Sequence, residues 1–240
     1  MIRGFYTARS GMIAHQQRID TVANNLANAN TVAFKPMRTN FKDLVYQNVN
    51  RPAAQDTAMT GHGVKVNKNG LDMAQGRLES TDRNFDLALT HDGDFFMVET
   101  PEGGNLYTRA GNFHLSNEDN EFYLVDGSGN YVLDSEEERI EIVVEDGGTA
   151  QFDPSMVGVW RFPNPHGLIA SGNNHFAPSV SAGEPELLEI PEYKQGYLEG
   201  SATDVAYEMT AVIEASKAFS FSSRMLMVAD EIEQTVNSLR

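Results

Sequence analysis

Residues 1–30, MIRGFYTARSGMIAHQQRIDTVANNLANAN, determine how the rest of the chain is interpreted. Apolar side chains return every seven positions here, in two rows set three residues apart. A seven-residue repeat is typical of a helix that packs along another helix. The sequence therefore predicts a long N-terminal helix, which ends near residues 28–30 in an asparagine-rich cap. The rows are Phe5, Met12, Ile19 and Leu26, and Ala8, His15, Val22 and Ala29.

The C-terminal residues 204–240 show a matching pattern with three heptad rows. Three adjacent rows make a face that is wide enough to pack on more than one side. A helix over 204–238 would be about 50 Å long at 1.5 Å per residue. We hypothesise that the two terminal helices pack together and complete their burial only between copies of the chain. The rows are Val212, Phe219 and Leu226; Ala215, Ser222, Ala229 and Val236; and Ala218, Met225, Ile232 and Leu239.

The residues between the helices have a different pattern of apolar and turn-forming residues. Short β-type runs alternate with turn signals at a spacing of about ten residues, which favours an antiparallel sandwich or barrel. The predicted fold is α+β, with discontinuous N- and C-terminal helices and a central antiparallel all-β domain. The expected domains are a helical assembly domain (1–30 with 204–240), an extended connector (31–63), the β domain (64–192) and a return connector (193–203).

Finer expectations follow from local signals. The predicted strands cover 64–66, 85–89, 95–99, 106–109, 113–115, 122–125, 131–133, 140–144 and 156–162. Residues 43–48 are expected to form one helical turn, and 163–191 to be mostly loop because they contain several glycines and prolines. Ser201 to Asp204 fits the spacing of a capping box. Trp160, the only tryptophan, is expected in the core.

Composition excludes several functions. The formal net charge is −16, whereas nucleic-acid binding needs clustered lysine and arginine, so neither nucleic acid nor an anionic membrane surface is an expected partner. The chain has no cysteine and therefore no disulfide framework. No apolar run approaches the roughly 18 residues of a membrane span. The N-terminus shows no cleaved secretory signal.

The polar residues form no recognisable catalytic or metal-binding pattern. The six histidines lack metal-ligand spacing, and His15 lies in a heptad row, where a polar residue more often sets register. Residues 126–130, DGSGN, begin like a calcium loop but lack its later ligands. Asp92 and Asp94 flank a glycine as in a turn. We therefore expect no enzyme activity, no catalytic residue, no metal and no cofactor.

Several separate motifs resemble those of the bacterial flagellar rod and hook proteins. Residues 23–35, ANNLANANTVAFK, are similar to the N-terminal signature of that family. The resemblance continues through FKDLVYQ (41–47), QGRL (75–78), FDLAL (85–89), DGDFF (92–96), YTRAGNF (107–113), FPNPHGL (162–168), GNN (172–174) and QGYLEGS (195–201), followed by Glu208 and Met209. The chain departs from the family at Ala33, Ala202 and Lys217, where Gly, Asn and Arg are usual. The loss of glycine before Phe34 removes conformational freedom at that turn.

The resemblance covers nearly the whole chain and implies a structural role. It fits the distal rod branch best, with the proximal rod branch as a near rival. Such subunits are exported unfolded into the cell envelope through the flagellar type III export apparatus, without a cleaved signal, and form a tubular drive shaft in the basal body. The expected partners are copies of itself, other rod and hook subunits, the export apparatus and the rings around the rod. The expected interface residues are Phe5, Met12, Ile19, Val22, Asn24, Asn25, Leu26, Asn28, Phe34, Lys35, Val212, Phe219, Met225, Leu226, Ile232 and Leu239.

Two alternatives remain open from the sequence. One is a secreted β-rich protein that binds or hydrolyses cell-wall glycan, with the helices as an oligomerisation stalk; it would need paired carboxylates such as Asp92 and Asp94. The other is an ordinary closed oligomer held by a coiled coil.

Overall fold

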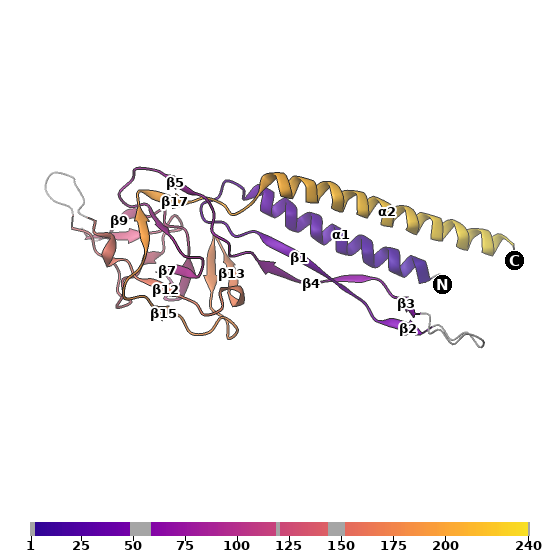
Figure 1. Cartoon of the computed structure of the whole chain (residues 1–240), viewed down its shortest axis with the longest axis horizontal. Coiled ribbons are helices and arrows are strands. Elements are labelled where there is room, and N and C mark those ends of the chain that lie inside the picture. Colours follow the sequence, from indigo (N-terminus) through magenta and orange to yellow (C-terminus); the bar gives the residue numbers. More distant parts are fainter. Residues whose placement is uncertain (1–2, 49–58, 119–120, 144–151, 240) are drawn as a thin grey trace. The chain divides into compact units, whose positions relative to one another are not determined.

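The computed structural model describes residues 3–48, 59–118, 121–143 and 152–239 (Figure 1). The chain divides into two compact units, one made of residues 1–27, 37–70 and 204–240 and the other of residues 28–36 and 71–203. The long helices are α1 (Arg3–Ala27) and α2 (Val205–Ser238), and the short 3-10 helices are η1 (Pro154–Met156) and η2 (Pro165–Gly167). The strands are β1 (Met37–Asp43), β2 (Tyr46–Asn48), β3 (Met59–Gly61), β4 (Val64–Leu71), β5 (Leu78–Ser80), β6 (Leu87–Leu89), β7 (Asp94–Glu99), β8 (Asn105–Thr108), β9 (His114–Glu118), β10 (Glu121–Val125), β11 (Tyr131–Val132), β12 (Val159–Arg161), β13 (Ile169–Gly172), β14 (His175–Ala177), β15 (Glu186–Leu187), β16 (Tyr193–Gln195) and β17 (Tyr197–Glu199).

Both predicted terminal helices form. α1 ends at Ala27, just before the asparagine-rich segment. α2 begins after Asp204, whose side chain accepts hydrogen bonds from the backbone N–H groups of Ala206 and Tyr207. This cap differs from the predicted capping box, because Ser201 bonds to Thr203 instead and the helix starts at Val205. The Asp204 carboxylate thus provides hydrogen-bond acceptors for two of the N–H groups that have no partner within the helix.

The segment after α1 differs from the expected connector. Its backbone is extended, as expected, but it is paired into strands, with β1 bonded to β4 and β2 to β3, and β2 forms where a helical turn was predicted at 43–48. This ladder belongs to the same unit as the helices. The Ser10 hydroxyl of α1 accepts a hydrogen bond from Val64 N at 3.3 Å, and the His15 ring meets Phe41 edge to face. His15 thus contacts strand β1.

The second unit is built around β7. One edge of β7 pairs with β8, and its other edge pairs first with β12 and then with β11. The sheet runs β13-β14-β8-β7-β11-β10-β9, with β12 and β15 off this path. The pairs within it are antiparallel, as predicted.

Alternation along β7 separates two hydrophobic cores. Phe96 and Val98 point into one cluster, and Phe95 and Met97 point into the other, because successive side chains of a strand face opposite sides. All four side chains are almost fully buried. Trp160 lies in the second cluster, where the sequence placed it.

The second unit differs from the predicted strands in several places. Strands β5, β16 and β17 form where the sequence predicts none, and Met156, the first residue of the predicted strand 156–162, belongs to η1. The predicted strand 140–144 is reduced to one isolated bridge, between Glu141 and Tyr123, and Val144 lies outside the described residues. The expected loop 163–191 contains β13, β14 and β15. These strands are short and mostly exposed, except for β14, so they lack the apolar alternation that marks a strand. The predictions for residues 49–55 and for the turn at 146–148 also lie outside the described residues.

Candidate assembly surface

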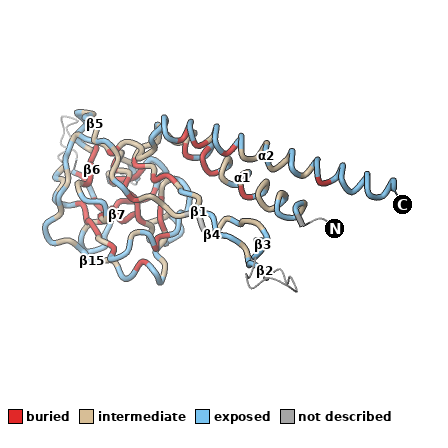
Figure 2. The backbone as a smooth tube through the Cα atoms, turned by 45° about the vertical axis from the view of Figure 1, so that its right-hand side comes forward, coloured by how far each residue is buried: buried red, intermediate tan, exposed pale blue. Residues whose placement is uncertain are grey.

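The two terminal helices lie antiparallel, side by side (Figure 1). Three contacts fix their register: Asn25 with Glu208, Arg18 with Glu214, and Gly11 opposite Ser222. The residue numbers of each pair add to 232 or 233, so Arg3, the first described residue of α1, falls opposite Asp230. The part of α2 after Asp230 therefore has no described α1 residue opposite it. Residues 231–239 are all exposed, in agreement with this register (Figure 2).

Small side chains allow the helices to approach closely. A methyl group added at Gly11 would meet the Ser222 hydroxyl at 3.3 Å, which is a tight contact. Ala14 of α1 and Ala211 and Ala215 of α2 are buried. α2 buries only four residues in total among those described, three of them alanines and the fourth Glu208. The helix pair is thus held by a narrow seam, which leaves most of α2 uncovered.

Asn25 connects three elements of the helical unit. Its side chain donates to Met37 O at 2.8 Å and accepts from Met37 N at 2.9 Å, which ties the end of α1 to the start of β1. The same amide donates to Glu208 Oε1 at 3.1 Å, in the first turn of α2. Asn25 and Glu208 are both buried. A carboxylate also suits the first turn of a helix, where backbone N–H groups create positive potential.

Lys35 belongs to a buried ionic cluster in the other unit. Its Nζ lies 2.7 Å from Glu199 Oε1, and Arg109 Nε lies 2.9 Å from Glu199 Oε2. Gly76 N also donates to Glu199 Oε1, and a side chain at Gly76 would collide with the Gly200 carbonyl. Burial, followed by the nearby Arg109 charge, lowers the pKa of Lys35, while Glu199 opposes this shift. The cluster fixes the segment that follows α1 to the strand that precedes α2.

Ala33 adopts a left-handed conformation with φ of 53°. It is buried, and its N–H donates to Glu199 O at 2.7 Å. The turn therefore uses the conformation that glycine adopts without strain, although an alanine occupies it.

The structure distributes the predicted interface residues over several environments. The contacts that join α1 to α2 run through Gly11, Arg18 and Asn25, one position before the predicted row of Phe5, Met12, Ile19 and Leu26. That row is half-buried, as are Asn28, Phe34, Val212, Phe219 and Leu226. Val22, Asn25 and Lys35 are buried; Asn24, Met225, Ile232 and Leu239 are exposed.

An outward apolar row on α2 was only partly recognised in the sequence. It contains Phe221, Met225, Val228, Ile232, Val236 and Leu239. Its members are three or four residues apart, which matches the 3.6-residue period of one helix face. Between 47% and 84% of each side chain is exposed. Phe221 and Val228 were missed because the heptad rows in the sequence grouped residues by a seven-residue repeat, whereas this face follows the straight-helix period.

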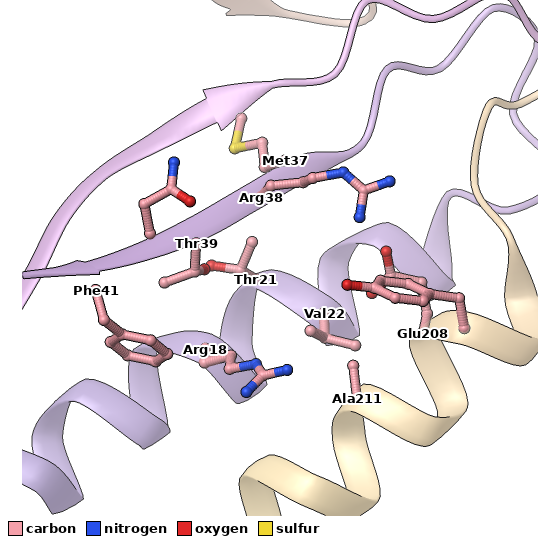
Figure 3. Close-up of a pocket in the computed structure, with 11 residues that line it drawn as sticks. Arg18, Thr21, Val22, Met37, Arg38, Thr39, Phe41, Glu208 and Ala211 are labelled. Atoms are coloured by element: carbon pink, nitrogen blue, oxygen red, sulfur yellow. The ribbon is translucent and has the colours of Figure 1, made fainter.

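A pocket opens between α1, β1 and α2 within the helical unit (Figure 3). Its volume is about 270 Å³. Val22, Met37 and Ala211 supply apolar surface, while Arg18 and Arg38 bring positive charge. The Arg38 guanidinium also lies 5.1 Å from the centre of the Tyr207 ring.

Two aspartates that the sequence suggested for other chemistry, Asp94 and Asp126, make structural hydrogen bonds instead. Asp94 is buried and receives two hydrogen bonds from Arg161, at 2.6 and 3.0 Å. Asp126 closes its turn by accepting from Ser128 N and Asn130 N, and it lies 2.6 Å from His175 Nε2. Among the described residues, no group of three or more His, Cys, Asp or Glu residues is arranged to hold a metal ion. Neither helix in the described part of the chain has a stretch long and apolar enough to span a bilayer.

Comparison with known proteins gives matches along the whole chain. Three family models match: Flagella basal body rod protein (5–35), Flagellar hook protein FlgE/F/G D1 domain (90–155) and Flagellar basal body rod FlgEFG protein C-terminal (194–239). The flagellar basal-body rod protein FlgG of Borreliella burgdorferi is 34% identical over 100% of this chain and 99% of its own length. The FlgG proteins of Bacillus subtilis and Caulobacter vibrioides are 33% and 32% identical, with coverage of 100% and 98% of both chains, respectively.

Paired terminal helices with an uncovered apolar row, joined to an antiparallel β unit, define a structural subunit of an axial assembly. Within that class, the chain belongs to the flagellar basal-body rod protein family, in its FlgG group. It is a rod subunit located in the flagellar basal body, and it assembles with itself and other rod and hook components. The comparisons confirm the family inferred from the sequence, and the structure confirms the α+β fold class.

Proposed function

We propose that the chain builds a tubular drive shaft by packing the terminal helices of successive copies, and that this shaft passes torque to the hook. The observation that carries the proposal is the exposed apolar row of α2, from Phe221 to Leu239, beside a seam already occupied by α1. Burial of apolar surface stabilises by about 25 cal/mol per Å². Even a few hundred Å² per copy, repeated along a lattice, would give a rigid assembly after the cost of ordering is met.

The contacts would be open-ended. A surface on one copy would meet a different surface on the next, and such heterologous contacts build filaments when rotation does not close a ring. We further propose that the subunit reaches this site unfolded through the flagellar type III export apparatus, and that rings around the rod are its outer neighbours. The absence of cysteine is compatible with that route, because no disulfide must be reduced before export.

Met225→Asp tests the proposal. Met225 is 61% exposed on the outward row, so the substitution should leave the folded subunit intact and abolish swimming and incorporation into basal bodies. Ser216→Asp is the matched control, because Ser216 is exposed and lies nine residues earlier, on the opposite side of α2. Swimming of the Met225→Asp strain at the wild-type rate would refute the proposal.

The substitution Leu226→Asp is less suitable. Leu226 is half-buried, so an aspartate there could weaken the α1–α2 pair itself as well as assembly. Sedimentation of the purified protein adds a separate test. A finite dimer or trimer would support a closed oligomer, whereas a species that grows only on a pre-existing rod supports the open lattice.

A further inference from the structure

We propose that the pocket lined by α1, β1 and α2 receives the Ile232 turn of α2 from a second copy of the chain. This inference rests on the proposed function and assigns one specific contact within the lattice. The pocket is small: about 270 Å³ is below the roughly 300 Å³ at which small-molecule sites begin. One large aliphatic side chain and its immediate neighbours suit a pocket of this size.

The lining of the pocket matches such an occupant. Val22 and Ala211 form an apolar wall where the two helices meet, and Phe41 flanks it on β1 (Figure 3). Arg18 and Arg38 bring two positive charges to the rim of the pocket, and Glu208 and Glu214 bring two negative charges, of which only Glu208 is buried. Arg18 is paired with Glu214 at 3.3 Å, but the Glu214 side chain is 64% exposed and such surface pairs contribute little stability, so Arg18 can exchange Glu214 for a carboxylate of the second copy.

The C-terminal part of α2 carries the complementary features. Ile232 is 49% exposed and is flanked in sequence by Glu231 and Glu233. No described residue of α1 lies opposite this turn. An acidic turn with an apolar centre therefore meets an apolar pocket bordered by arginines, and the charges favour this pairing over the contact of like surfaces.

The occupant must come from another molecule. Ala211 lines the pocket, and Ile232 lies 21 residues further along the same continuous helix. At 1.5 Å per residue, this places Ile232 roughly 30 Å from its own pocket. Because the donor turn and the receiving pocket are different surfaces, the contact is heterologous and can be repeated without limit.

Cysteine cross-linking provides the test, since the natural chain has no cysteine. Phe41→Cys combined with Ile232→Cys should form an intermolecular disulfide in isolated basal bodies under mild oxidation. A disulfide requires Cα atoms about 4.4–6.8 Å apart, which excludes a bond within one chain. Phe41→Cys with Gln234→Cys is the matched control, because Gln234 is exposed and lies on the other side of the same turn.

A dimer from the first pair and none from the control would support the contact. Equal dimer from both pairs, or none from either in basal bodies that contain the subunit, would overturn it while leaving the proposed shaft function intact. Absence of the unmodified subunit from basal bodies would instead refute the proposed function and, with it, this contact.

Charge reversal gives an independent readout. Arg38→Glu should cause loss of swimming, and Glu233→Arg in the same chain should restore it, because every copy then carries both halves of the exchanged pair. Undiminished swimming of the Arg38→Glu strain, or failure of Glu233→Arg and Glu231→Arg to restore it, would overturn the assignment.

Discussion

The side chain of Asn25 pairs with the backbone of Met37 as a neighbouring strand would. Its carbonyl oxygen accepts from Met37 N at 2.9 Å, and its amide nitrogen donates to Met37 O at 2.8 Å. The amide nitrogen also reaches Glu208 of α2. One buried side chain thus satisfies two backbone groups and one carboxylate.

We predict that Asn25→Asp destabilises the helical unit by about 3–5 kcal/mol, because it removes a donor and places a second carboxylate beside buried Glu208. Urea unfolding followed by far-ultraviolet circular dichroism measures the change. Asn24→Asp is the control, since Asn24 is exposed on the same turn. Equal effects of the two substitutions would contradict the assigned role of Asn25.

Glu199→Gln should destabilise the β unit strongly. The substitution keeps the shape of the side chain but leaves two buried cations, Lys35 and Arg109, without a counter-charge, at a cost of about 3–5 kcal/mol. Unfolding of this unit can be followed by the fluorescence of Trp160, because Trp160 is buried in the unit and is the only tryptophan in the chain. The exposed Glu189→Gln provides the baseline. If the denaturation midpoint of Glu199→Gln lies within error of that of Glu189→Gln, the ionic cluster contributes no stability.

Ala33 allows a test of backbone strain. Ala33→Val should destabilise by about 2 kcal/mol or more, because a β-branched residue is strained at positive φ and the added methyl groups enter a buried site. Ala33→Gly should change stability by less than about 1 kcal/mol, since relief of strain offsets greater freedom of the unfolded chain. Trp160 fluorescence during denaturation distinguishes these outcomes. Destabilisation by Ala33→Gly as large as that by Ala33→Val would show that the methyl packing of Ala33 outweighs any backbone strain.

Asp126 should make the β unit sensitive to acid. Burial raises the pKa of Asp126, but the hydrogen bonds from His175, Asn130 and Ser128 outweigh burial and hold the pKa below its ordinary value of 3.8. The folded state thus binds fewer protons, so this contribution is complete above pH 3.8 and is lost as the pH falls through the lower, folded-state pKa.

Asp126→Asn should therefore cost roughly 1–3 kcal/mol near neutral pH, as expected for disrupted buried hydrogen bonds. The difference from the wild-type chain should shrink below pH 3.8, where the wild-type carboxyl group is also becoming neutral. Denaturation series at several pH values measure this trend. A difference that stays constant with pH would show that the charge of Asp126 is not responsible.

The sequence predicted elements whose stability arises locally. Heptad rows identified both helices, and short apolar runs between turn signals identified β7 and its neighbours. Strand β1, MRTNFKD, was missed because most of its side chains are exposed in a two-stranded ladder. Strand β1 is held instead by its pairing with β4 and its contact with α1, which no local sequence pattern reveals.

The candidate site was predictable only in part, since its polar contacts join distant residues. Asn25 was interpreted as part of an asparagine-rich helix end, yet its partners lie 12 and 183 positions away. Lys35 and Glu199 are 164 positions apart. The sequence identified Lys35 through family resemblance, but no local pattern indicated that Glu199 would neutralise it.

The described part of the helix pair has unlike ends, because α2 extends beyond the described residues of α1 on one side only. At one end α2 has no described α1 residue opposite it, and at the other end both helices are present, with Asn25 hydrogen-bonded to Glu208. A column of such pairs stacked by one repeated contact has all its members pointing the same way. Its two tips then present different surfaces to an arriving molecule, so the offset between two helices is sufficient to give a growing structure a direction.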